Sequence, residues 1–138
     1  MWWIYAFLSA LFAAATAILV KKGVSTISPN LATGIRTIVI LIMIWGIVLF
    51  RGEARGFSGM SRQHLLFLVL SGMATGLSWM CYLKAMQLGA ASKVAGVDKL
   101  SLVFTVGFAA LFLGESITIK TGIGICLIVS GMVLMIMK

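Results

Sequence analysis

The chain alternates between long hydrophobic runs and short polar segments, a pattern that predicts helices crossing a membrane. A helix needs about 20 mainly apolar residues to cross about 30 Å of hydrocarbon. Runs of this length lie at about residues 2–20, 29–50, 63–88, 93–113 and 117–137. The predicted fold is therefore all-α: an integral membrane bundle of five transmembrane helices, forming one domain over residues 1–138.

The segments between these runs carry signals that begin and end helices. Lys21 and Lys22 close the first run, and Ser28 before Pro29 is typical of an N-cap and a first helical residue. Residues 51–59 form a polar, glycine-rich loop. Glu115 lies in the last turn, where a negative charge suits the N-terminus of the final helix, so we predict a capping role for it.

Composition also favours lipid as the solvent. Hydrophobic residues make up 62% of the chain and charged residues 10%, against about 45–50% and about 25% in soluble domains. The net charge is +8, but the basic residues mostly flank the apolar runs, which favours lipid headgroups over nucleic acid. With one histidine and three acids, the chain offers no catalytic triad, metal cluster or phosphate loop. We therefore expect no enzyme, cofactor or metal.

The basic residues give almost no preferred orientation. Loops after odd-numbered helices share one side of the membrane. That side carries Lys21, Lys22, Lys84, Lys93 and Lys138, and the other carries Arg51, Arg55, Arg62 and Lys120. With five basic residues against four, the positive-inside rule predicts almost no preference for either orientation. Either the chain has one orientation that these counts do not encode, or it inserts both ways and pairs as an antiparallel homodimer, the unfused form of an inverted repeat.

Polar residues follow one face of four predicted helices, at spacings of three, four or seven. The faces in the second, third and fourth runs include Thr33, Arg36, Thr37, Ser71, Thr75, Ser78, Trp79, Tyr82, Asp98 and Ser101. A single serine or threonine commonly bonds its own backbone or a neighbouring helix. Four such faces around one bundle favour a cavity with a polar lining. Gly72 and Gly76 form a GxxxG pair, which predicts close helix packing.

Charged side chains also lie inside the spans. Arg36 and Asp98 each fall roughly 9–12 Å into a predicted helix, on helices that begin at the same side. An isolated charge there costs at least about 2.5–3.5 kcal/mol, so the two side chains are expected to pair. The pair is either a structural staple or part of a charged vestibule that attracts an anionic or zwitterionic substrate. Lys99 adjoins the vestibule, and Asp98 is the candidate for proton coupling.

The order of these segments resembles an EamA domain of the drug/metabolite transporter superfamily. The resemblance is carried by residues 81–101, by Phe112-Leu-Gly-Glu-Ser, and by the start of the chain at residues 9–19 and 31–37. Most members of that family carry two such repeats in inverted orientation, whereas this chain resembles the short single-repeat branch. The resemblance therefore implies a homodimer, in which the two copies are antiparallel if the chain inserts both ways.

The same resemblance implies a function. It predicts a secondary transporter that acts by alternating access on small metabolites, an exporter in preference to an importer, in the cytoplasmic membrane of a bacterium or archaeon. The alternative is a non-transporting membrane component, such as an accessory subunit or a lipid-handling scaffold. That alternative predicts a stable complex with a different protein.

Overall fold

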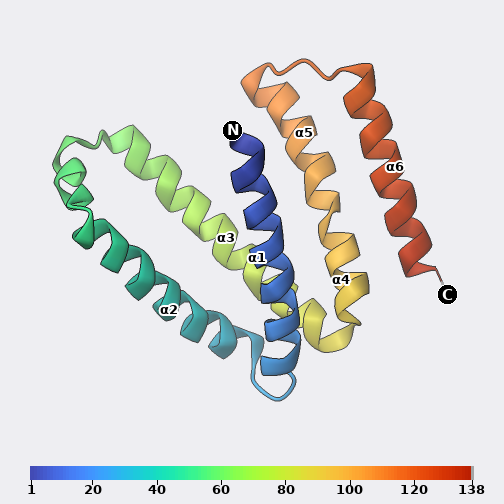
Figure 1. Ribbon diagram of the computed structural model, residues 1–138, viewed down its shortest axis with the longest axis horizontal. Coiled ribbons are helices and arrows are strands. Elements are labelled where there is room, and N and C mark those ends of the chain that lie inside the picture. The colour runs from blue at the N-terminus through green and yellow to red at the C-terminus, as the bar shows by residue number, and fades with distance from the viewer. Residues whose placement is uncertain (138) are drawn as a thin grey trace. The chain divides into compact units, whose positions relative to one another are not determined.

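The computed structural model describes residues 1–137, and all regular structure in that range is helical (Figure 1). The elements are α1 (Trp2–Gly23), α2 (Pro29–Phe50), the 3₁₀ helix η1 (Glu53–Gly59), α3 (Arg62–Leu88), α4 (Ala91–Asp98), α5 (Leu100–Leu113) and α6 (Ile119–Ile136). Five helical segments are long and apolar enough to cross a membrane, with α4 and α5 together making one. The predicted all-α membrane fold is confirmed. Lys138, counted above among the basic residues, lies outside the described residues.

The chain divides into two compact units. One comprises Val20–Gln87 and holds α2, η1 and α3, together with the last turn of α1. The other combines Met1–Leu19 with the residues from Leu88 onward, and so holds most of α1 and all of α4, α5 and α6.

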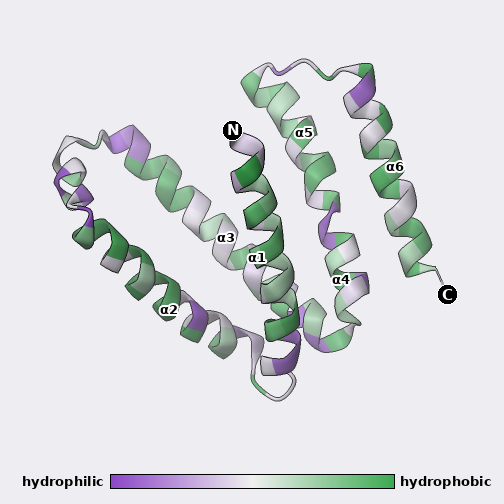
Figure 2. Ribbon diagram, viewed as in Figure 1, coloured by the Kyte–Doolittle hydropathy of each residue, from purple (hydrophilic) through white to green (hydrophobic). Residues whose placement is uncertain are grey.

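Apolar side chains cover the outside of the long helices. Hydrophobic colour dominates each of them in Figure 2, and hydrophilic colour is confined to their ends, to a band within α2 and to the junction of α4 and α5. Among the described residues, the buried ones are Ala17, Val20, Val24, Ala32, Leu83, Met86 and Met132, and none is polar. Burial of so few residues cannot offset the conformational entropy that the chain loses on folding in water. Lipid must therefore cover the remaining apolar surface.

The polar signals before and after α2 act largely as the sequence predicts. The Ser28 hydroxyl accepts a hydrogen bond from the Leu31 N–H at 3.3 Å, and Pro29 is the first helical residue. After α2, Gly52 adopts a left-handed conformation with φ of 69°, which favours glycine. The predicted loop is ordered there as η1. An exposed Arg51–Glu53 ion pair of 3.6 Å adds little stability.

Hydrogen bonds join the end of α1 to the end of α3 within the 20–87 unit. The Lys21 ammonium donates to the Met86 carbonyl at 2.6 Å. The Gln87 side-chain amide donates to the Val24 carbonyl at 2.9 Å and the Ile27 carbonyl at 2.6 Å. The connection between α1 and α2 is thereby held against the last turn of α3.

The fourth span, predicted over residues 93–113, runs from Ala91 to Leu113 but is interrupted at one residue, Lys99, which itself keeps an αR conformation. The Lys99 N–H donates to the Gly96 carbonyl at 3.1 Å and the Leu102 N–H to the Lys99 carbonyl at 3.0 Å. These i-to-i+3 bonds tighten the backbone and divide the span into α4 and α5. No proline causes the break; it coincides with the adjacent charges of Asp98 and Lys99. Both α4 and α5 pack against α6.

The capping role predicted for Glu115 is wrong. Helix α5 ends at Gly114, whose φ is 68°, and the Glu115 N–H donates to the Ala109 carbonyl at 3.2 Å. Helix α6 begins only at Ile119. Its N-cap is Thr118, whose hydroxyl accepts from the Thr121 N–H at 3.2 Å. Three non-helical residues therefore separate Glu115 from Ile119, and the N-cap position belongs to Thr118.

Candidate functional site

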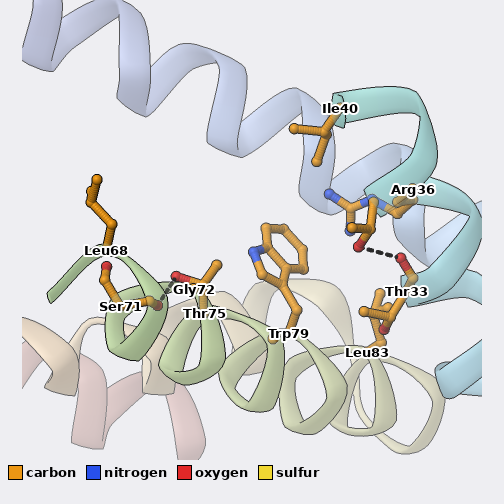
Figure 3. A pocket seen from close by; sticks show the side chains of 11 residues that line it. Thr33, Arg36, Ile40, Leu68, Ser71, Gly72, Thr75, Trp79 and Leu83 are labelled. Atoms are coloured by element: carbon orange, nitrogen blue, oxygen red, sulfur yellow. Dashed lines mark hydrogen bonds between the residues drawn. The ribbon is translucent and has the colours of Figure 1, made fainter. Parts of the chain in front are cut away.

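A cavity of about 400 Å³ lies between α2 and α3 in the 20–87 unit (Figure 3). Helix α2 contributes Thr33, Arg36, Thr37 and Ile40, and α3 contributes Leu68, Ser71, Gly72, Thr75, Gly76, Trp79 and Leu83. Pockets for small molecules typically measure about 300–1,000 Å³. This cavity is thus at the small end of the range that holds a ligand.

Helical spacing brings these residues to one wall on each helix. On α2 they recur at steps of three and four, and on α3 the same steps run from Leu68 to Leu83. The two helices run antiparallel, so the start of α2 faces the later turns of α3. Figure 3 shows the Arg36 and Trp79 side chains pointing toward one another across the cavity, with Leu68 and Ser71 toward its other end.

Arg36 stacks on an aromatic pair. Its guanidinium carbon lies 3.9 Å from the centroid of the Trp79 ring, well within the range of a cation–π interaction. Tyr82, one turn further along α3, meets Trp79 edge to face, with ring centroids 5.4 Å apart and an interplanar angle of 80°. The Trp79 ring thereby contacts both the Arg36 cation and the Tyr82 ring.

The charge of Arg36 is incompletely satisfied in this cavity. Its Nη1 atom is buried and has no hydrogen-bond partner among the described residues. No acidic side chain lines the cavity, so Arg36 is the one charged group among the lining residues. A guanidinium inside a membrane span is costly when left uncompensated, and such residues commonly mark substrate or ion pathways.

Three threonine hydroxyls in the cavity wall donate to their own helix. Thr33 donates to the Pro29 carbonyl at 2.8 Å, Thr37 to the Thr33 carbonyl at 2.9 Å, and Thr75 to the Ser71 carbonyl at 2.9 Å. A hydroxyl has one hydrogen, so each of these oxygens offers only acceptor capacity to the cavity. Arg36 therefore differs from them in being a strong, available donor.

Gly72 and Gly76 open the cavity wall instead of forming a close helix contact. A Cβ atom added to either glycine would meet no atom within 4 Å, beyond the helix's own backbone. The close packing predicted from the GxxxG pair is therefore not what these glycines do in this structure. The missing side chains leave space beside Thr75 and Trp79, and both glycines line the cavity.

The structure brings together part of the predicted site. Arg36, Thr75 and Trp79 line one cavity and Tyr82 supports it, whereas Ser78 is not among the lining residues. Asp98, Lys99 and Ser101 belong to the other unit, so the predicted Arg36–Asp98 pair stays a prediction. The structure places Asp98 and Lys99 exposed at the junction of α4 and α5.

The apolar walls of the cavity were not among the predicted site residues. Ile40, Leu68 and Leu83 complete the lining. Their signal was present in the spacing, because Ile40 lies four residues after Arg36 and Leu83 four after Trp79. In a span where almost every position is apolar, that spacing alone does not separate a cavity wall from a lipid-facing side chain.

The model of the EamA-like transporter family matches residues 1–137. The chain belongs to the EamA-like transporter family. An uncharacterized transporter from Sinorhizobium sp., described as lying in a cobO 3′ region, is 45% identical over 134 residues, covering 97% of this chain and 95% of that protein. No solved structure matches. The resemblance predicted from the residues is confirmed, and membership of the EamA-like family points to a transporter and not an enzyme.

Proposed function

We propose that this chain is a secondary transporter that exports small metabolites across the cytoplasmic membrane of a bacterium or archaeon. The observation that carries the proposal is a cavity of about 400 Å³ inside the spans, with Arg36 as its charged group. A buried donor without a partner is poorly explained as a structural device, since an unpaired charge destabilises a fold. A substrate bound in the cavity can accept hydrogen bonds from the Arg36 guanidinium and balance its charge. Export in preference to import rests on the family alone.

The transporter acts as a homodimer in this proposal. Transporters with inverted repeats place the substrate site near the midplane, between two halves of opposite orientation. A chain with five spans supplies one such half. A second copy inserted in the opposite direction supplies the other, in agreement with the balanced basic residues. Exchange between two equivalent halves then gives alternating access to the two sides of the membrane.

The interruption between α4 and α5 is the second element of the proposed mechanism. Transporters commonly use interrupted helices where backbone groups and charges meet a substrate or coupling ion. Asp98 ends α4 and Lys99 forms the junction, while Ser101 lies in the first turn of α5. We assign Asp98 the role of proton acceptor in coupling, with Lys99 and Ser101 beside it.

The test is flux through the purified protein in proteoliposomes. A panel of small metabolites is loaded inside, and release is followed with and without an imposed pH gradient, against protein-free liposomes. We expect release of at least one class of solute, accelerated by a proton gradient and slowed in Asp98→Asn. Absence of protein-dependent flux across the panel contradicts the proposal. If a different membrane protein also copurifies, the accessory-subunit alternative gains support.

A further inference from the structure

The charge and shape of the α2–α3 cavity restrict what it can hold. Given the proposed role of this cavity as the substrate site, we infer that its ligand is a monoanionic organic acid. The carboxylate of that acid pairs with Arg36, and its apolar body fills the space along Gly72 and Gly76. The inference rests on the unpaired Nη1 atom, on the residues that line the cavity and on the hydrogen bonds of the threonines.

The Trp79 stack leaves Arg36 free to bind an anion. A cation–π contact uses the face of the planar guanidinium, whereas its N–H donors point outward along the edge. The guanidinium carbon lies over the Trp79 ring, 3.9 Å from its centroid, and none of the Arg36 side-chain N–H groups, the buried Nη1 included, has a hydrogen-bond partner among the described residues. A carboxylate has the matching fork geometry and accepts two parallel N–H bonds. Trp79 therefore holds the guanidinium in place, and Arg36 binds the ligand.

Charge balance selects a monoanion. Arg36 is the one charged group among the lining residues, so a single carboxylate brings the cavity to neutrality. A zwitterion adds an ammonium group, for which the lining offers only neutral acceptors such as the Thr37 and Thr75 oxygens. A dianion such as a phosphate monoester leaves one negative charge uncompensated. Binding a zwitterion or a dianion in a water-poor site therefore costs more free energy than binding a monoanion.

The far end of the cavity suits an apolar body. Ile40 and Leu68 supply aliphatic surface, and Gly72 and Gly76 present bare backbone with no atom within 4 Å of the point where a Cβ would lie. The threonine oxygens between them accept hydrogen bonds, so a hydroxyl on the ligand is tolerated there. The volume of about 400 Å³ limits the ligand to a small molecule.

A matched ligand series on the purified, unaltered protein tests the inference. Calorimetric titration compares 3-phenylpropionate with phenylalanine, which adds an ammonium, with 3-phenylpropylamine and with 3-phenyl-1-propanol. Titrations into protein-free micelles correct for partitioning. We expect saturable binding of 3-phenylpropionate, and binding about tenfold or more weaker for the other three. The amine and the alcohol lack the carboxylate that bonds to Arg36, and phenylalanine must also desolvate its ammonium. Phenyl phosphate is expected to bind more weakly as well.

Variants then place the carboxylate on Arg36. Arg36→Gln is expected to abolish the preference for 3-phenylpropionate over the alcohol, and Arg36→Lys to retain part of it, because the ammonium keeps the charge but loses the fork. Arg51→Gln is the matched control, since Arg51 is exposed beyond the end of α2 and pairs with Glu53. The ligand series on the unaltered chain decides the question even where a variant fails to fold.

The inference and the proposed transport function fail on different results. Binding of phenylalanine or the amine as tightly as 3-phenylpropionate overturns the inference, as does absence of saturable carboxylate binding at millimolar concentration. Neither result contradicts the proposed transport function, because the flux assay tests that function with a panel of other solutes. Carboxylate binding that depends on Arg36, without flux in either direction, supports the inference and counts against the transport function.

Discussion

Arg36 on α2 and Trp79 on α3 form one contact across the cavity, with the guanidinium carbon 3.9 Å from the ring centroid. The contact joins two helices that are separated by an open cavity. Arg36 is a charged residue inside a span, and no acidic residue lines the cavity with it. A cation–π contact of this kind holds the guanidinium in one arrangement while its N–H groups stay available to a ligand, as a ligand-binding site requires.

Replacing Trp79 should weaken substrate binding without removing the charge. In Trp79→Leu the stack on Arg36 is lost, and a partly desolvated cation–π interaction is worth about 0.5–2 kcal/mol. We expect the KM for a carboxylate substrate to rise about 2- to 30-fold, with a smaller change in kcat. Trp79→Phe keeps an aromatic face, so its KM should lie between those of the unaltered chain and Trp79→Leu. Flux measurements in proteoliposomes at several substrate concentrations give both constants.

The matched control for Trp79 is Trp45→Leu, on α2 but not among the cavity-lining residues. An equal rise in KM in both tryptophan variants would contradict a specific role for the stack. A change in kcat alone, with KM unaltered, would show that Trp79 acts on a later step than binding.

The sequence predicts the spans, but it predicts the cavity only in part, because the cavity depends on how the helices are placed. Span lengths follow from apolar runs, and Ser28-Pro29 encodes the start of α2 locally, so both were visible in the sequence. Gly72 and Gly76 serve close packing or an open wall equally well, and only the separation of α2 and α3 decides between them. The break at Lys99 has no proline signal, and Thr118 caps α6 in place of Glu115 because α6 begins late.

Gly76 offers a direct test of the open wall. Because a Cβ there meets no atom within 4 Å, Gly76→Ala should fold and gain up to about 1 kcal/mol from higher helix propensity. Gly76→Leu should also fold, but its side chain occupies the cavity. We expect substrate flux to fall about tenfold or more, since exclusion that costs above about 1.4 kcal/mol has this effect. Circular dichroism and flux assays measure the two effects separately.

Gly46→Leu is the comparison for Gly76→Leu, because Gly46 has equally open surroundings but lies outside the cavity on α2. It should leave flux near that of the unaltered chain. If Gly76→Leu transports normally, the space beside Gly76 is not part of the substrate pathway.

Gln87 should contribute measurably to stability. Its amide bonds the Val24 and Ile27 carbonyls, at 2.9 Å and 2.6 Å. Hydrogen bonds between helices in membrane proteins average about 0.6 kcal/mol each, so Gln87→Leu should lower the free energy of unfolding by about 1 kcal/mol. Thermal unfolding in detergent measures the loss. Gln63→Leu, at the exposed start of α3, should have little effect, and equal losses would argue against the role of Gln87.

The N-cap of α6 can be tested with two substitutions. Thr118→Ala removes the hydroxyl that accepts from the Thr121 N–H and should destabilise the protein by about 0.5–2 kcal/mol. Glu115→Gln removes a charge that lies before the helix and should change stability by less than about 0.5 kcal/mol. Unfolding in detergent ranks the two variants. A larger loss in Glu115→Gln would restore the carboxylate as the stabilising group at this turn.

Dual insertion predicts that each connection lies on both sides of the membrane. The connections at the two ends of α2 make a matched pair, tested with Thr26→Cys and Phe57→Cys in a chain whose exposed Cys81 and Cys126 are replaced by alanine. An impermeant maleimide applied to intact cells should label roughly half of each variant if the nearly equal basic residues leave insertion unbiased. With a single orientation, one variant is labelled fully and the other is protected.

Charge substitution turns this labelling into a test of the antiparallel dimer. Arg51→Ala with Arg55→Ala changes the distribution of basic residues from five against four to five against two, which should place residue 57 outside in nearly every copy. If transport needs two copies of opposite orientation, flux should fall in this uniformly inserted variant. Coexpression with a chain biased the other way, by Lys22→Ala, Lys84→Ala and Lys138→Ala, which leave two basic residues against four, should restore it. Full flux from a uniformly oriented population would show that the working unit contains parallel copies or one chain.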